Sequence, residues 1–224
     1  MKKSLIIVNA TMLVLIVILA IGYMLEGGLP LKSAASIMFV ATGFINLIAC
    51  IKNKRNLRYP IWMMVALVFA MLGDILLLIN FYIGTAAFAV GHIFYFVSYS
   101  MLERVNRRDL LCGLGISVMA VSFVLLTPFL DFKSALMQGV CCIYALIISF
   151  MVGKAISNLL KEKSHINKII VIGSILFFFS DLMLVLKMFG NMPKASYLCL
   201  GTYYPAQFIL AFSLLVYGSR KCVE

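Results

Sequence analysis

Charged residues are scarce in this sequence. Asp, Glu, Lys and Arg make up 12% of the 224 residues, whereas soluble proteins carry about 25%. Acidic residues are the scarcest, with 8 Asp and Glu against 19 Lys and Arg. Because 64% of the residues are hydrophobic, the composition excludes a water-soluble domain. It predicts a polytopic membrane protein, in which residues 1–224 form a single integral membrane domain.

Metal-ligand motifs are also lacking. The chain has only two histidines, and its six cysteines form no CxxC pair and no Cys/His group at ligand spacing. None of the apolar runs contains ExxH or HxxxH. Most of the cysteines fall in apolar runs, where a free cysteine behaves as a small hydrophobic residue. The sequence therefore predicts no metal site.

What the sequence has in abundance is long apolar runs. A membrane-spanning helix needs about 20 apolar residues. The first run is longer than the ~7–15 residues of a signal-peptide core, so we expect it to be a membrane helix. The fold class is therefore all-α, a bundle of eight transmembrane helices. The predicted spans are 5–24, 33–51, 59–80, 84–103, 110–127, 134–153, 167–188 and 198–217.

The basic residues alternate between the two sides of these spans. All but four of the 19 Lys and Arg residues fall on the side that holds both chain ends. The four exceptions are Lys32, Lys133, Lys187 and Lys194. Cytoplasmic loops carry the excess of basic residues, so we expect a multi-pass protein of the cell membrane with both termini in the cytoplasm. The basic clusters are short loops beside a lipid bilayer, which argues against nucleic acid as a partner.

Two carboxylates interrupt the apolar runs. Asp74 lies in the run 59–80 and Asp181 in the run 167–188, and no other acidic residue is expected at membrane depth. A charge at the bilayer centre costs at least ~2.5–3.5 kcal/mol. A chain that keeps two such groups is expected to use them, although a protonated carboxyl that joins two helices is the simpler alternative.

Other polar residues share the depth of the two aspartates. From a rise of about 1.5 Å per residue, Asp74, His92, Asp181, Tyr203 and Gln207 lie about 8–14 Å from the non-cytoplasmic ends of their spans. This agreement predicts one site. Tyr95 lies on the same helix face as His92, and Asn46 in the run 33–51 is a weaker candidate for the lining. Core packing of His92 and of the tyrosines, and a helix–helix hydrogen bond for Asn46, remain open.

Similar short sequence segments surround the two aspartates, in the third and the seventh apolar runs. This similarity suggests two halves of four helices in a parallel repeat. Two neighbouring carboxyls in a medium of low dielectric would not both ionise and would share a proton. Such a pair suits acid–base cleavage of acetal-like bonds, and it equally suits a small proton-coupled membrane transporter.

Two signatures in the chain resemble those of the YhhN-like lysoplasmalogenase family. The first signature comprises Gly73, Asp74, Phe81, Gly84, Phe88, His92 and Tyr95. The second comprises Gly173, Phe177, Ser180, Asp181, Leu184, Phe189, Thr202, Tyr203, Tyr204 and Gln207. The resemblance implies hydrolysis of the vinyl-ether bond of a lysophospholipid substrate, lysoplasmalogen, to a fatty aldehyde and a glycerophospho-base. It implies no metal or organic cofactor, and it implies Asp74 and Asp181 as the catalytic residues.

The roles of the two aspartates follow from their neighbours in the sequence. We expect Asp74 to be the proton donor, paired by depth with His92. We expect Asp181 to be the ionised carboxylate, oriented by Tyr203 or Gln207. The opposite assignment stays open if His92 stabilises a charged Asp74. A non-catalytic lipid-binding role is a third alternative, in which the two aspartates do not need each other.

Overall fold

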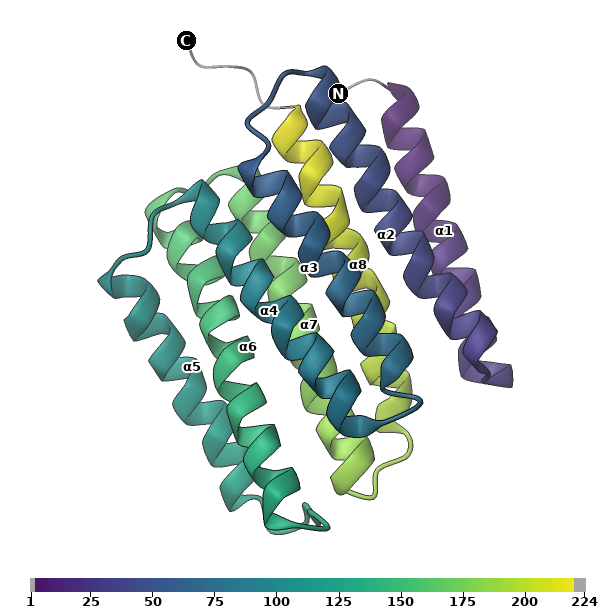
Figure 1. Cartoon of the computed structure of the whole chain (residues 1–224), viewed down its shortest axis with the longest axis vertical. Coiled ribbons are helices and arrows are strands. Elements are labelled where there is room, and N and C mark those ends of the chain that lie inside the picture. Colours follow the sequence, from purple (N-terminus) through teal and green to yellow (C-terminus); the bar gives the residue numbers. More distant parts are fainter. Residues whose placement is uncertain (1–2, 220–224) are drawn as a thin grey trace.

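The computed structural model describes residues 3–219, and this part of the chain folds into eight helices with no strand. Each helix is long and apolar enough to cross a membrane, so the prediction of an all-α protein with eight spans is confirmed. Figure 1 shows the helices side by side, roughly parallel to one axis. They are α1 (Lys3–Glu26), α2 (Leu29–Lys52), α3 (Arg58–Leu76), α4 (Phe81–Leu102), α5 (Arg107–Leu126), α6 (Ala135–Lys161), α7 (His165–Phe189) and α8 (Ala195–Gly218).

Two helices extend well beyond the apolar runs that predict them. Helix α2 begins at Leu29 rather than at 33, with a proline in its first turn, where a missing N–H costs least. Helix α6 continues to Lys161 rather than ending at 153. Its last turns carry polar side chains that find buried partners, so Asn158 donates to the carbonyl of Tyr99 (2.9 Å). Hydrophobicity alone therefore underestimates both helices.

The two halves of the chain have nearly the same order of helix neighbours. Helix α2 packs against α3 and α8, and its counterpart α6 packs against α7 and α4. Helix α1 packs against α2, as α5 packs against α6. In Figure 1, α1 and α5 lie at opposite edges of the molecule. This is the pattern that a parallel repeat of two four-helix halves produces.

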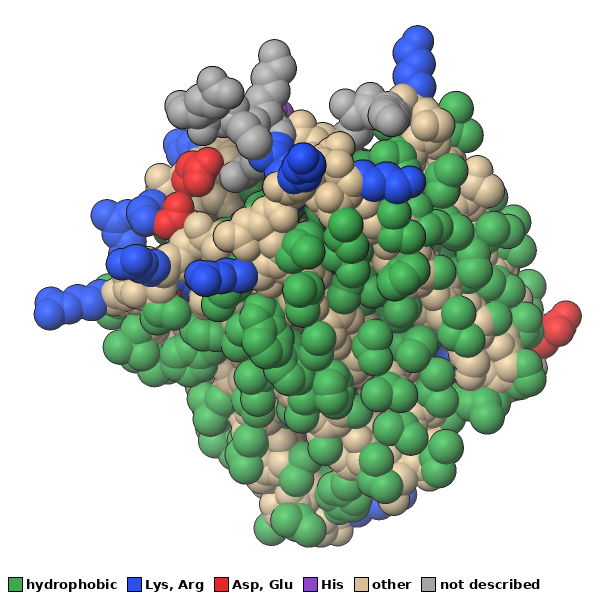
Figure 2. All heavy atoms as spheres, turned by 45° about the horizontal axis from the view of Figure 1, so that its top comes forward, with side chains coloured by type: hydrophobic (Ala, Val, Ile, Leu, Met, Phe, Trp, Pro, Cys, Tyr) green, Lys and Arg blue, Asp and Glu red, His purple; other side chains and the backbone are tan. Residues whose placement is uncertain are grey.

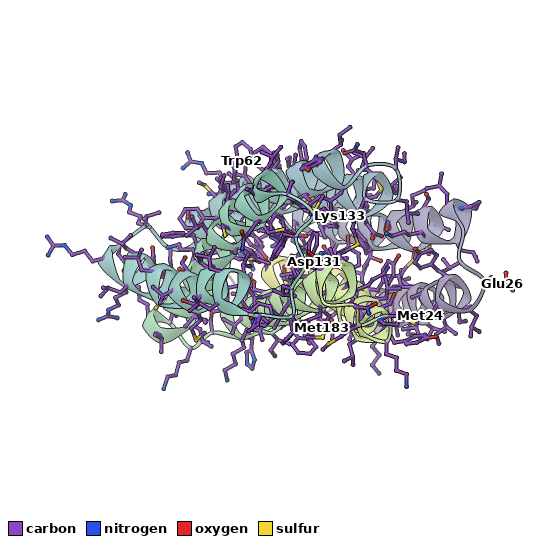
Figure 3. The ribbon with its side chains drawn as sticks, turned by 90° about the horizontal axis from the view of Figure 1, so that it is seen from below. Met24, Glu26, Trp62, Asp131, Lys133 and Met183 are labelled. Carbon is purple, nitrogen blue, oxygen red and sulfur yellow. The ribbon has the colours of Figure 1, made fainter. Side chains whose placement is uncertain are left out.

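Charge separates the two ends of the bundle. The α2–α3, α4–α5 and α6–α7 connections lie at one end, where Lys and Arg side chains gather above apolar flanks (Figures 1 and 2). We call this the basic end. The opposite, or far, end is the one seen in Figure 3, where Glu26, Asp131 and Lys133 are labelled. Many large hydrophobic side chains are exposed on the flanks, as expected of a surface that faces lipid.

A buried ion pair joins α5 to α6 at the basic end. Lys154 Nζ lies 2.8 Å from Asp109 Oδ2 and also donates to the carbonyl of Arg104 (3.2 Å). Lys154 follows directly after the predicted span 134–153, where a loop was expected, yet its side chain is fully buried within α6. Close by, a Cβ on Gly153 would lie 2.5 Å from the backbone nitrogen of Gly113, so glycine is required there for the two helices to approach.

Candidate active site

The two aspartates occupy matching places on α3 and α7, toward the far end. Asp74 lies in the last turn of α3 and is 4% exposed, and Asp181 lies in α7 and is 8% exposed. Gly73 allows the ring of Phe88 to lie directly against α3, because a Cβ at position 73 would come within 2.6 Å of that ring. Phe88 is thereby held beside Asp74 as part of the wall of the site.

Asp74 binds a cation and two hydroxyl groups. Lys32 Nζ on α2 lies 2.9 Å from Oδ1. Ser36 on the same helix donates to Oδ2 at 2.6 Å, and Tyr204 on α8 donates to Oδ2 at 3.1 Å. An ammonium and two hydroxyl donors together stabilise an ionised carboxylate.

Asp181 contacts two aromatic side chains through one of its oxygens. The hydroxyl of Tyr144 on α6 donates to Oδ2 at 2.6 Å. His92 Nε2 on α4 lies 3.3 Å from the same oxygen and 2.7 Å from the Tyr144 hydroxyl. The structure thus corrects the expected pairing of His92 with Asp74, since the imidazole contacts Asp181 instead. No lysine or arginine in the described part of the chain forms an ion pair with Asp181.

His92 is buried, and one of its two ring nitrogens is unpaired in the described part of the chain. Its side chain is fully buried and packs against the ring of Phe177, with the two ring centroids 4.6 Å apart. Within residues 3–219, Nδ1 has no hydrogen-bond partner. A protonated imidazole would bury an unpaired N–H at Nδ1, which is costly. A neutral ring with its proton on Nε2 donates toward Asp181 and leaves only a lone pair unpaired.

The two aspartates therefore have the same layout of partners but different chemistry. Each carboxylate receives a donor from the preceding even-numbered helix, α2 or α6, and a donor from the other half, α8 or α4. For Asp74, the donors from the preceding helix include the ammonium of Lys32. For Asp181, the donor from the preceding helix is the phenol of Tyr144. One aspartate is ion-paired with a lysine and the other is not.

A cavity with charged walls connects the two carboxylates. It holds about 750 Å³ of space, including the part open to the outside. We call it the polar cavity. Its polar lining comprises Tyr23, Lys32, Asp74, Ser180, Asp181, Lys187, Ser196 and Tyr203. The lining residues Leu78, Lys187 and Met188 are exposed and lie near the ends of α3 and α7, so the cavity has its mouth at the far end.

A second, apolar space adjoins the other side of Asp181. It is a partly open cleft of about 680 Å³ between α4, α5, α6 and α7. We call it the apolar cleft. Asp181, Tyr144 and Thr85 are its main polar lining residues among alkyl and aromatic side chains. The residues that line both the cleft and the polar cavity are Phe88, Asp181, Leu184 and Met188. Asp181 is thus the titratable group at the junction.

The remaining predicted residues form hydrogen bonds with groups other than the two aspartates. Tyr203 lines the polar cavity but donates to the carbonyl of Ala70 (2.9 Å), and Gln207 accepts from the Tyr95 hydroxyl (2.7 Å). The expectation that Tyr203 or Gln207 hydrogen-bonds Asp181 was therefore wrong. Tyr95 and Gln207 line neither space.

Asn46 lies away from both cavities. Its side chain exchanges hydrogen bonds with Asn9 on α1, at 2.9 Å each, and donates to the carbonyl of Ala211 on α8 (3.1 Å). It joins three helices, which is the alternative that the sequence left open for it.

Two partners of the aspartates were not predicted from the sequence. Lys32 was placed outside the second span, yet it is 4% exposed and contacts Asp74. Tyr144 was not singled out, although it is the only tyrosine in its apolar run. No group of three or more His, Cys, Asp or Glu side chains that could hold a metal ion occurs among residues 3–219.

Comparison with known proteins gives one result. The model of the YhhN family matches residues 10–214 of the chain, from within α1 to within α8, and so includes every residue of the site. Neither the comparison with curated proteins nor that with solved structures gives a match.

Proposed function

The chain belongs to the YhhN family, which includes lysoplasmalogenases, and on this premise we propose that it hydrolyses the vinyl-ether bond of lysoplasmalogens. The products are a fatty aldehyde and a glycerophospho-base.

One observation carries the proposal, namely the meeting of a polar cavity and an apolar cleft at Asp181. A lysoplasmalogen has a charged headgroup and glycerol on one side of its vinyl ether and a hydrocarbon chain on the other. The polar cavity suits the first part and the apolar cleft suits the second. A lipid bound in this way has its vinyl ether beside Asp181, the position at which a proton is needed.

The first step is proton transfer to carbon. Asp181 Oδ1 has no hydrogen bond to another described residue, while Oδ2 accepts from Tyr144 and lies within hydrogen-bond distance of His92 Nε2. In its protonated form, Asp181 gives the proton on Oδ1 to the β-carbon of the vinyl ether, whose π electrons form the new C–H bond. The positive charge that develops is shared by the α-carbon and the ether oxygen, as in an oxocarbenium ion.

Asp74 acts on the second step. Its carboxylate, ion-paired with Lys32, stabilises the cation and accepts a proton from the water that attacks the α-carbon. The resulting hemiacetal then collapses. The glycerol oxygen takes the proton from Asp74 as the C–O bond breaks, the hydroxyl proton returns to Asp181, and the aldehyde forms. Both aspartates end in their starting states.

This assignment exchanges the roles expected from sequence. The β-carbon belongs to the chain side of the vinyl ether, and Asp181 is the aspartate that also lines the apolar cleft. Asp74 lines the polar cavity, on the side of the glycerol. The ammonium beside Asp74 and the neutral donors on Asp181 support the same division.

The transporter alternative receives less support from the cavities. Transport needs a path to the aspartates from both ends of the bundle. The polar cavity and the apolar cleft both lie toward the far end. Fully buried tyrosines, among them Tyr59, Tyr95 and Tyr99, fill the core between the aspartates and the basic end.

The test is release of aldehyde from lysoplasmalogen by the purified protein. Asp181→Asn and Asp74→Asn each keep the size of the side chain and remove its acid–base function, so turnover should fall by about 10²–10⁴. The double variant should lose little more than the worse single one, because members of one catalytic unit are not additive. The matched control is Asp131→Asn, at an exposed aspartate in the α5–α6 connection. Near-normal turnover in both folded single variants would rule out the mechanism.

A further inference from the structure

Lys187 is a cation at the mouth of the polar cavity. Its side chain is exposed, and it lines the cavity near the end of α7. In the part of the chain that the structure describes, no carboxylate lies within ion-pair distance of its ammonium group. A lysine in this position is free to bind an anion that enters from the far end.

A second lysine lies deeper in the same cavity. Lys32 is 4% exposed, and its ammonium group contacts Asp74 and lies 5.6 Å from the centre of the Tyr23 ring. The charge of Lys32 is balanced by Asp74. With a proton on Asp181, the lining residues therefore carry one unbalanced positive charge, that of Lys187. The cavity thus favours a ligand group with a single negative charge near Lys187.

We propose that Lys187 is the phosphate-binding residue of a lysophospholipid subsite in the polar cavity, with Lys32 supporting it from within. This inference rests on the proposed function. It adds a binding site for the phosphate of the substrate, a group that takes no part in the reaction itself. A phosphodiester carries one negative charge, and lysine binds phosphate as a point charge. The neutral glycerol fits between Lys187 and Asp181.

The spacing on α7 agrees with this placement. Lys187 follows Asp181 by six residues, which is about 9 Å along a helix axis. In a lysoplasmalogen only the glycerol separates the phosphate from the vinyl ether. A phosphate held by the flexible side chain of Lys187 therefore leaves the vinyl ether near Asp181 and directs the chain into the apolar cleft. The subsite fixes which way round the lipid binds.

Lys194 provides a matched control. It is an exposed lysine in the connection between α7 and α8 at the same end of the bundle, but it lines neither the cavity nor the cleft. General attraction of anionic lipid to the far end would depend on Lys187 and Lys194 alike. A specific phosphate subsite in the cavity would depend on Lys187 and not on Lys194.

The experiment measures binding without turnover. Two ligands with the same saturated alkyl-ether chain are compared, 1-O-alkyl-lysophosphoethanolamine and 1-O-alkylglycerol, by the shift each causes in the thermal unfolding of purified protein. Lys187→Gln should weaken binding of the phosphate-bearing ligand about 10-fold and leave alkylglycerol unchanged. Lys194→Gln should change neither. In turnover assays, Lys187→Gln should raise KM for lysoplasmalogen while kcat stays near its original value.

Several results would overturn the subsite. Equal weakening of both ligands by Lys187→Gln would show a structural role, and an equal effect of Lys194→Gln would show general surface attraction. Displacement of the lysophospholipid by inorganic phosphate at the same concentration as the lipid would assign the site to free phosphate. The proposed function can fail separately. If the protein binds the phosphate-bearing ligand through Lys187 but releases no aldehyde, the subsite is supported and the proposed hydrolase activity is wrong.

Discussion

Lys32 and Asp74 form a buried ion pair at 2.9 Å, with about 5% of each side chain exposed. A second such pair, Lys154 and Asp109 at 2.8 Å, lies at the opposite end of the bundle. The two pairs are close in distance and burial. They differ in place, because only Lys32 and Asp74 line a cavity. This difference allows stability and activity to be separated.

Lys32→Met should lower both stability and turnover. Removing one partner of a buried ion pair costs about 3–5 kcal/mol, because the remaining charge is uncompensated. The Asp74 carboxylate would also lose the ammonium that holds it in position to accept a proton from water, so turnover should fall by about 10²-fold or more. Thermal unfolding and aldehyde release by the same purified sample measure the two effects.

The control for that prediction is Lys154→Met. It should reduce stability by a similar amount and leave the turnover of each folded molecule within about twofold of the original, since distant sites act independently. The double variant Lys32→Met with Asp74→Asn should regain most of the lost stability but no activity. If Lys154→Met reduces turnover as strongly as Lys32→Met, the role assigned to the Lys32–Asp74 pair is wrong.

Tyr144→Phe should reduce turnover with little loss of stability. The change removes one hydroxyl, which donates to Asp181 at 2.6 Å and contacts His92 at 2.7 Å. Without it, Asp181 is held less firmly, and we expect a decrease in kcat of about 10-fold to 10²-fold. Steady-state kinetics with lysoplasmalogen measures the decrease.

Tyr99→Phe is the comparison for Tyr144→Phe. Tyr99 is another buried tyrosine with a side-chain partner, Ser174 at 2.9 Å, but it lines neither space. Removal of the Tyr99 hydroxyl should lower the free energy of unfolding by about 1 kcal/mol and leave kcat unchanged. Equal kinetic effects of the two variants would mean that Tyr144 acts only through packing.

Filling the apolar cleft should select against long chains. Ala145 on α6 is buried and lines the cleft, so Ala145→Phe places a ring where we expect the hydrocarbon chain. KM for a long-chain lysoplasmalogen should rise by about 10-fold, because each buried CH₂ that is lost costs about 0.8 kcal/mol, and a short-chain analogue should be affected less. The control is Leu146→Phe, at the neighbouring residue, which is 41% exposed on the flank. A uniform effect on all chain lengths would place the chain elsewhere.

The basic end should face the cytoplasm. The excess of Lys and Arg at this end predicts the orientation, and both ends of the described chain lie there (Figure 1). An alkaline phosphatase fused after Glu224 should be inactive in a bacterial host. The same reporter fused after Lys133, in the connection at the far end (Figure 3), should be active. The reverse result would invert the orientation.

The sequence predicts the helices well because their main cause is local. Each apolar run long enough to span a bilayer is a helix in the structure, and the aspartates stand out because a charge in such a run is costly. Asp74, Asp181 and Tyr203, which were predicted to lie at similar depth, line one cavity. These inferences need only composition and the rise of a helix.

The partners of the aspartates could not be predicted in the same way. Depth places a residue along the helix axis but does not say which helices are neighbours, so His92 was assigned to the wrong carboxylate. The packing of α6 against α4 and α7 decides that Tyr144 and His92 reach Asp181. Lys32 was misplaced because hydropathy ends a helix where a charge begins, whereas a buried counterion allows α2 to begin earlier.

The junction at Asp181 has a consequence for how the reaction ends. In the proposed hydrolysis, cleavage of the vinyl ether would separate the two parts of the lipid where the polar cavity meets the apolar cleft. The glycerophospho-base is then left facing the exposed mouth and water, and the aldehyde is left in a partly open hydrocarbon-like space. In this proposal the two products would leave into different phases, water and lipid, and their separation would oppose the reverse reaction.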